Sequence, residues 1–163
     1  MYILFENVEL SLETRNQRKV RNELLKRLPT PGDELMARDF RAKYPHCNHR
    51  PTRVSLQYNC HGLTFAARRT AITDSESIQA ILDDDGYVSV VEDGVEAGDI
   101  VVYSEDGDFS HSGIVTKIDP IGNAKVIWVL SKWGKAHEVV HRIRDCPYAG
   151  HPETEIRFWR IIQ

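Results

Sequence analysis

The sequence predicts an α+β domain in which N-terminal helices pack on an antiparallel β-sheet. Apolar residues recur at helical spacing in the first half of the chain, whereas β-branched runs separated by turns fill most of the second half. Helices followed by strands in this way are typical of α+β proteins. A chain of 163 residues can bury one core, so we expect a single domain, residues 1–163, with an N-terminal helical part over residues 1–50 and the main core over residues 51–163.

The composition restricts the class of protein. Hydrophobic residues make up 41% and charged residues 28% of the chain, as in ordinary globular proteins. The net charge of −3 argues against a broad nucleic-acid surface, and no apolar run approaches the roughly 20 residues of a membrane span. Three cysteines without a CxxC pair indicate folding in the cytoplasm, and because residues 1–12 lack the pattern of a secretion signal, any export would follow a signal-peptide-independent route.

Periodicity and turn residues place the elements. Helices are predicted over residues 13–28, 33–44, 61–71 and 75–82. Pro29 and Pro31 end the first of them, and Asp74 or Ser75 caps the last.

Strands are predicted over residues 87–91, 99–103, 112–118, 125–130 and 155–162, which gives a sheet of about five or six strands. Residues 94–98 and 105–107 are the expected hairpin connections, and residues 53–58 form a short extended segment.

Cys60 is the first candidate for chemistry. A free cysteine is most often a small buried hydrophobe, but such a residue usually has apolar neighbours, and Cys60 stands between Asn59 and His61 at the start of a predicted helix. The partial positive charge of a helix N-terminus lowers a thiol pKa, and free backbone N–H groups there can face a developing oxyanion. We therefore interpret Cys60 as a nucleophile.

His111 opens the apolar run His111-Ser-Gly-Ile-Val after a turn rich in Asp and Gly. A lone histidine at a strand start is commonly a surface residue, but beside a nucleophilic cysteine it has the chemistry of a general base. Gly113, two residues on, has no side chain, so another segment or a substrate can approach the strand closely.

These motifs resemble a known group. Asn-Cys-His-Gly-Leu from Asn59, Gly-Asp-Ile-Val-Val from Gly98 and His-Ser-Gly-Ile-Val from His111 are similar to the motifs Asp-Cys-Ser-Gly-Leu, Gly-Asp-Leu-Val and His-Val-Gly-Ile-Tyr of the papain-like NlpC-type and CHAP-type cell-wall amidases. The resemblance spans about residues 53–133, and it departs at Asn59 and His61. It implies a papain-like catalytic core over residues 51–163 and a cysteine hydrolase that needs no cofactor, with Cys60 carrying a thioacyl intermediate and His111 as general base.

The residue that orients the catalytic imidazole is less defined. In the resembling families a polar residue on the next strand has this role, and Ser131 is the positional match, although it departs from the usual His, Asn, Gln or Glu. A hydroxyl can accept the ring N–H. His137 and His141 are rivals, and a purely structural turn with Trp133 in the core is an alternative.

Other polar residues near Cys60 have two interpretations each. Tyr58 can donate its hydroxyl to an oxyanion or simply pack, and Gln57 and His61 are further candidates for oxyanion or substrate binding. His46, Cys47 and His49 offer zinc ligands, but the paired spacing of zinc sites is absent, so no metal is expected.

The resemblance points to peptidoglycan stem-peptide bonds as the substrate, in an effector or toxin that an inhibitor or immunity protein would restrain. Two alternatives stay open. One is a cytosolic protease or deamidase that acts on a peptide or other amide, and the other is a non-catalytic partner-binding or regulatory domain on the same fold.

Overall fold

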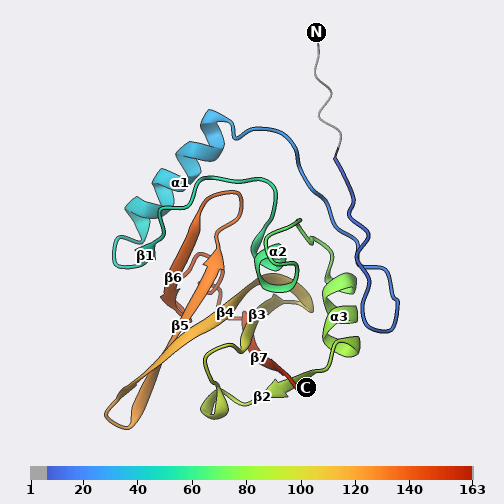
Figure 1. Ribbon diagram of the computed structural model, residues 1–163. Helices are drawn as coiled ribbons and strands as arrows, with labels where there is room; N and C mark the ends of the chain where they lie inside the picture. Colours follow the sequence, from blue (N-terminus) through green and yellow to red (C-terminus); the bar gives the residue numbers. More distant parts are fainter. Residues whose placement is uncertain (1–6, 163) are drawn as a thin grey trace.

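The computed structural model describes residues 7–162 and shows an α+β protein, which confirms the predicted class (Figure 1). Within this range it contains three α-helices and one seven-stranded sheet. The helices are α1 (Pro31–Lys43), α2 (Cys60–Phe65) and α3 (Ser75–Asp84). Residues 1–6, part of the segment in which no secretion signal is expected, lie outside the described range. None of the helices between residues 7 and 162 is long and apolar enough to cross a lipid bilayer.

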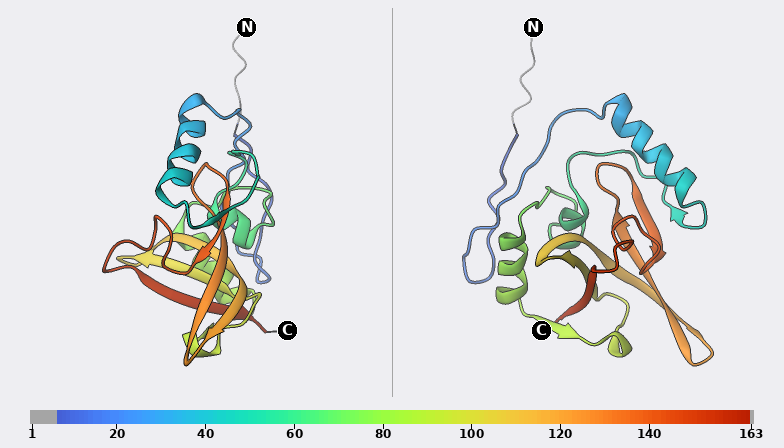
Figure 2. Two further views of the ribbon diagram at one scale, coloured as in Figure 1. Left: turned by 90° about the vertical axis from the view of Figure 1, so that its left-hand side faces the viewer. Right: turned by 180° about the vertical axis from the view of Figure 1, so that it is seen from behind.

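The sheet is antiparallel throughout, in the order β1-β6-β5-β4-β3-β7-β2. Its strands are β1 (Asn48–His49), β2 (Tyr87–Val90), β3 (Ile100–Glu105), β4 (Asp108–Ile121), β5 (Ala124–Lys132), β6 (Glu138–Arg142) and β7 (Glu155–Ile161). The long β4–β5 hairpin projects from the body of the molecule (Figure 2). The prediction missed β1, which has only two residues, and β6, which lacks a sustained apolar run.

The connections differ in part from the prediction. Asp106 and Gly107, both at positive φ, join β3 to β4 as the expected hairpin. Residues 94–98, by contrast, do not form a hairpin, because β7 lies between β2 and β3 in the sheet. The short 3-10 helix η1 (Glu92–Gly94) lies in this connection instead.

The interior strand β3 separates two apolar clusters. Val101 and Tyr103 belong to the cluster that also holds Trp133, while Ile100 and Val102 belong to the cluster under α3. Successive residues of a strand point to opposite faces, so β3 is buried on both sides. The sheet therefore provides a rigid support for side chains on either face.

Helix α1 begins with a capping box formed by Thr30 and Asp33, and Pro31 occupies its first turn. Its last turn carries Phe40, and Tyr44 follows as the C-cap; both rings pack edge-on against Trp133 at centroid distances of 5.3 and 5.0 Å. The helix is thereby fixed to the end of β5.

Helix α2 is shorter than the predicted helix over residues 61–71. A Cβ atom on Gly62 would lie 1.9 Å from the carbonyl oxygen of Thr70, so the helix and the returning chain are in direct backbone contact. The reversal is made at Ala67 and Arg68, whose φ angles of 49° and 65° are left-handed and end the helix. This tertiary contact outweighs the helical periodicity of residues 66–71.

The predicted helix over residues 13–28 is wrong. The segment is extended, with a turn at Gln17 and an isolated bridge between Glu13 and Lys19. The carboxylate of Asp84 at the end of α3 accepts hydrogen bonds from Thr14 and Arg18. The segment consequently lies alongside α3 (Figure 1), where its charges have partners that an isolated helix would not supply.

Candidate active site

Cys60 is the first residue of α2 and is only 7% exposed. The side chain of Asn59 caps the helix, accepting from the N–H groups of Gly62 and Ile72 and donating to the carbonyl of Ile72. A carboxylate has no hydrogen to donate to the Ile72 carbonyl, so this bond requires an amide side chain at position 59. The cap holds Cys60 against the sheet, where α2 packs on β4 and β5.

Two imidazoles lie near the sulfur, His61 from α2 and His111 from β4. Burial raises the pKa of the Cys60 thiol, but the charges of His61 and His111 and their hydrogen-bonding capacity lower it more, so the net pKa lies well below the ordinary value. Burial instead raises the pKa of Cys47 and of Cys146 to about 11. Of three buried thiols, only Cys60 is in an environment that favours the thiolate.

The hydrogen bonds of His61 fix its protonation state. Thr64 Oγ1 donates to the carbonyl of Cys60 at 2.9 Å, and Ser112 Oγ donates to Thr64 Oγ1 at 2.9 Å. Ser112 has no second hydrogen, so the Nδ1 of His61, 2.8 Å from that hydroxyl, must donate to it. The Nε2 of His61 donates to the carbonyl of Phe109 at 3.1 Å. Both ring nitrogens therefore carry hydrogen, and His61 is an imidazolium.

The charge on His61 has a partner. Burial lowers the pKa of His61, but the Cys60 thiolate and the bond to Phe109 raise it more, and the net shift is upward. The helix itself contributes little to the thiolate, because α2 has six residues and a short helix has a small dipole. Cys60 and His61 thus form a buried ion pair.

His111 is held differently. Its ring stacks on Tyr148 with centroids 4.0 Å apart and planes 10° apart, and Tyr103 contacts it at 5.3 Å. Neither ring nitrogen has a hydrogen-bond partner within the described part of the chain, although the residue is fully buried. His111 is within electrostatic reach of the sulfur but not yet hydrogen-bonded to it, a common arrangement before substrate binds.

The structure does not bring Ser131 onto His111. Its hydroxyl accepts from the Trp133 indole at 3.1 Å and donates to His141 Nε2 at 2.7 Å. The Nδ1 of His141 donates to the carbonyl of Arg142, and burial lowers the pKa of His141 to about 3. The predicted orienting role of Ser131 is corrected to a structural one, and aromatic packing positions the His111 ring instead.

The other candidates near Cys60 also have assigned partners. The hydroxyl of Tyr58 donates to Glu138, and burial together with that carboxylate raises the pKa of Tyr58 to about 12. Both ring nitrogens of His61 are occupied. Neither side chain is therefore free to face an oxyanion. The backbone N–H groups of Cys60 and His61 remain available, since no hydrogen bond to them is found between residues 7 and 162.

Sequence reasoning missed Lys132, Glu138 and Tyr148. Lys132 is completely buried and donates to the carbonyl of Gly134, and burial lowers its pKa to about 8 against the opposing charges of Cys60 and Glu138. A lysine at the end of an otherwise apolar strand is the one signal that could have identified it. Tyr148 lies in an irregular segment after β6 with no local pattern.

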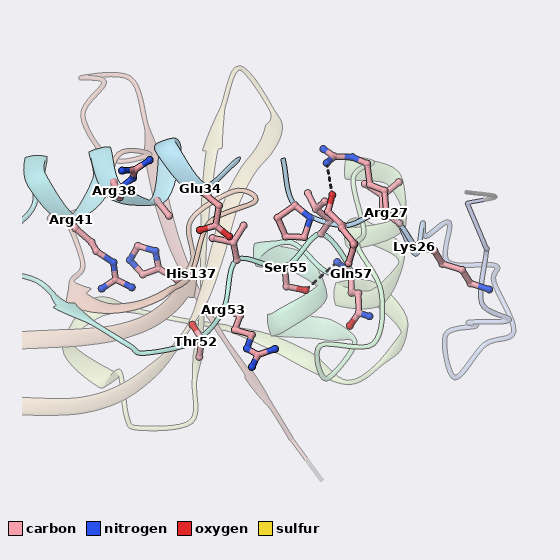
Figure 3. Close-up of a pocket in the computed structure, with 16 residues that line it drawn as sticks. Lys26, Arg27, Glu34, Arg38, Arg41, Thr52, Arg53, Ser55, Gln57 and His137 are labelled. Carbon is pink, nitrogen blue, oxygen red and sulfur yellow. Dashed lines mark hydrogen bonds between the residues drawn. The ribbon is translucent and has the colours of Figure 1, made fainter. Parts of the chain in front are cut away.

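A groove of about 720 Å³ lies beside this centre, between α1 and residues 52–57 (Figure 3). Cys60 does not line it, but Gln57, three residues before the nucleophile, does. The groove is therefore distinct from the centre, and Gln57 is its lining residue nearest to Cys60 in sequence.

Within residues 7–162 no three His, Cys, Asp or Glu side chains are grouped as metal ligands. His49, one of the possible zinc ligands in the sequence, forms hydrogen bonds instead with His137 and with the carbonyl of Tyr44.

Comparison of the chain with protein-family models, with curated proteins and with solved structures gives no match.

Proposed function

We propose that the protein is a cysteine hydrolase of amide bonds with a papain-like arrangement, in which Cys60 is the nucleophile and His111 transfers protons. The observation that carries the proposal is the packing of α2, which begins at Cys60, on β4, the strand that contains His111. In agreement with this placement, His61 and His111 lower the pKa of the Cys60 thiol, whereas burial raises the pKa of Cys47 and of Cys146. A cysteine on a helix packed against an antiparallel sheet, with a histidine on a strand of that sheet, supports the same assignment.

The reaction follows from the positions of the groups. The Cys60 thiolate attacks the carbonyl carbon, and the negative charge moves from sulfur to the carbonyl oxygen, where the free N–H groups of Cys60 and His61 can stabilise it. His111 then donates a proton to the leaving nitrogen as the C–N bond breaks, which leaves a thioester on Cys60. Water attacks the thioester, His111 takes its proton, and the acid and the Cys60 thiolate are released.

The two histidines have separate tasks in this scheme. His61 donates both of its hydrogens to fixed acceptors, so it supplies positive charge and no mobile proton. His111 has two unpartnered ring nitrogens, so no protein group competes for the proton that it carries. Lys132 is a further cation within electrostatic reach of Cys60.

Two measurements test the proposal. At pH 6, iodoacetamide should label Cys60 faster than Cys47 and Cys146, as mass spectrometry of peptides would show, because the pKa of Cys60 is shifted downward and those of the other two thiols are shifted upward. With p-nitrophenyl acetate the protein should release one equivalent of nitrophenol in a burst and gain the mass of one acetyl group. Cys60→Ala should abolish the burst, and His111→Ala should slow deacylation by about 100-fold or more.

Labelling of Cys60 no faster than of the other two thiols, together with no burst, would contradict the proposal. The protein would then be better described as a partner-binding or regulatory domain on the same fold. Rapid labelling without any acylation would equally count against hydrolysis, since a reactive thiol alone does not cleave amides.

A further inference from the structure

We propose that the groove between α1 and residues 52–57, named here the basic groove, binds an extended acidic peptide, the part of the substrate that lies next to the bond cleaved at Cys60. This inference rests on the proposed hydrolase function and names its class of substrate. Four observations support it: the charge of the lining, its apolar and non-aromatic floor, the unpaired backbone of one wall, and one buried ring nitrogen.

The charge of the basic groove is one-sided. Its charged lining residues are Lys26, Arg27, Arg38, Arg41, Arg53 and Glu34. Only Arg27 is neutralised by a carboxylate, that of Asp33 at 2.9 Å, whereas Lys26, Arg38 and Arg53 form no ion pair within residues 7–162. Figure 3 shows the Arg41 side chain extending from α1 on the side where His137 lies. Unpaired cations are thus concentrated in the basic groove, although the net charge of the chain is −3.

The rest of the lining favours a peptide over a nucleic acid. Leu25, Leu28, Val54 and Leu56 give the groove apolar surface that suits aliphatic side chains. No Phe, Tyr or Trp side chain is found among the lining residues, so the platform on which single-stranded bases stack is missing. The cations therefore fit carboxylates spaced along a polypeptide.

One wall offers backbone groups for pairing. Residues 51–55 belong to no helix or strand and run as an open stretch of chain between β1 and α2 (Figure 1). No hydrogen bond to the backbone N–H or carbonyl groups of residues 53–56 is found in the described part of the chain. A partly exposed segment with unpaired backbone groups can bind an extended chain as an added strand.

A buried nitrogen also lacks a partner. His137 is 1% exposed and lines the basic groove, and its Nδ1 has no hydrogen-bond partner within residues 7–162. The Nε2 of His49 donates to the carbonyl of Tyr44, and the Nδ1 of His49 lies 2.7 Å from the Nε2 of His137. The Nε2 of His137 is thus occupied, and its free Nδ1 is a buried polar atom that a backbone group of a bound peptide can satisfy. Burial, with the charges of Arg41, His49 and Lys132, lowers the pKa of His137 to about 4 and keeps the ring neutral.

The groove is close enough to the nucleophile to position a scissile bond. Gln57 lines it and stands three positions before Cys60, so the Cα atoms of these two residues are at most about 11 Å apart. Three or four residues of a bound extended peptide span that distance.

Binding is tested with Cys60→Ala protein, so that cleavage plays no part. The probes are two fluorescein-labelled ten-residue peptides, one alternating Glu with Ala and the other with Gln in place of every Glu, measured by fluorescence anisotropy. The Glu peptide should bind at least about tenfold more tightly, and the difference should shrink in 0.5 M salt, where charges are screened to within about 4 Å. Adding Arg38→Glu and Arg53→Glu should weaken its binding by about 30-fold.

The matched control is Arg157→Glu, an exposed charge reversal on β7 that should leave affinity within about twofold. Equal binding of the two peptides, or affinity that survives the Arg38 and Arg53 reversals, would overturn the inference. So would tighter binding of a ten-nucleotide oligothymidylate that those reversals abolish, which would assign the groove to nucleic acid. Thiol labelling of the unmodified protein is a separate readout, so failure of the groove and failure of the hydrolase proposal are distinguishable.

Discussion

His61 and His111 lie beside one sulfur yet differ in every contact of their ring nitrogens. His61 is fixed by Ser112 and the carbonyl of Phe109, while the nitrogens of His111 have no partner between residues 7 and 162 and its ring stacks on Tyr148. In the proposed mechanism both rings supply positive charge to Cys60, but only His111 has free ring nitrogens with which to transfer a proton. In a simple thiol–imidazole pair, one ring would have to provide all of the charge and also transfer the proton.

This division predicts different defects for two variants. Replacing His61 by Ser, the residue at this position in the resembling families, removes a cation, so the pKa of Cys60 should rise and the pH midpoint of iodoacetamide labelling should move upward by about 1 unit or more. His111→Ala should instead impair deacylation most strongly. Labelling rates from pH 4 to 9, with acetyl-enzyme lifetimes, separate the two. An unchanged labelling midpoint in His61→Ser would show that His61 does not stabilise the thiolate.

At the scale of the element, helix α2 depends on one glycine. A Cβ on Gly62 would overlap the carbonyl of Thr70, a backbone group that cannot rotate away. Gly62→Ala should therefore lower the free energy of unfolding by about 3 kcal/mol, as strong overpacking does, and displace Cys60 from the sheet. Urea unfolding measures the loss. Gly150→Ala, where a Cβ meets nothing within 4 Å, is the control and should change stability by less than about 0.5 kcal/mol.

The same contact explains what sequence could and could not predict. The cap of α3 by Asp74 and the strands around Val101 and Val115 follow from local pattern, and their positions are confirmed within a few residues. The length of α2 is set by Thr70, and the extended form of residues 13–28 is set by Asp84, which are tertiary effects. The periodicity of the sequence predicts neither the contact with Thr70 nor the hydrogen bonds to Asp84.

The residues of the candidate site were likewise predictable only in part. Cys60 and His111 could be selected from their neighbours, and the structure places them together. The group that packs on His111 could not, because Tyr148 comes from an irregular segment 37 positions later, and stacking has no sequence spacing. Position along a strand favours Ser131 as the orienting residue, but its hydroxyl is already shared between Trp133 and His141.

At the scale of the whole molecule, Glu138 joins segments that are distant in sequence. Its carboxylate, 2% exposed, accepts from Tyr58 at 2.7 Å and from Arg68 at 2.6 Å and pairs with Arg50 at 3.5 Å. Its backbone N–H donates to Thr52. Strand β6, the wall of the basic groove and the chain after α2 thus meet at one residue.

Glu138→Ala should consequently lower the free energy of unfolding by about 2 kcal/mol, less than for a fully buried pair because both arginines are partly exposed. Burial raises the pKa of Glu138, but the bonds from Arg68 and Tyr58 lower it more. The folded pKa lies below the unfolded value of 4.5, so this stabilisation is present above pH 4.5 and is lost as the pH falls through the folded pKa.

Urea unfolding at pH 7 and at pH 3 tests this dependence. The difference between the unmodified protein and Glu138→Ala should be larger at pH 7. Glu155→Ala, at a carboxylate 63% exposed on β7, should change stability by less than about 0.5 kcal/mol at either pH. A Glu138→Ala effect that is the same at both pH values would assign the loss to packing rather than to charge.

Under the proposed function, the near-complete burial of Cys60 has a consequence for target selection. A carbonyl can reach a residue that is 7% exposed only on a narrow, flexible strip of polymer, such as a tail or an unfolded stretch. Intact globular domains are too bulky to deliver a peptide bond to that depth. Burial of the nucleophile would thus discriminate between targets by their shape.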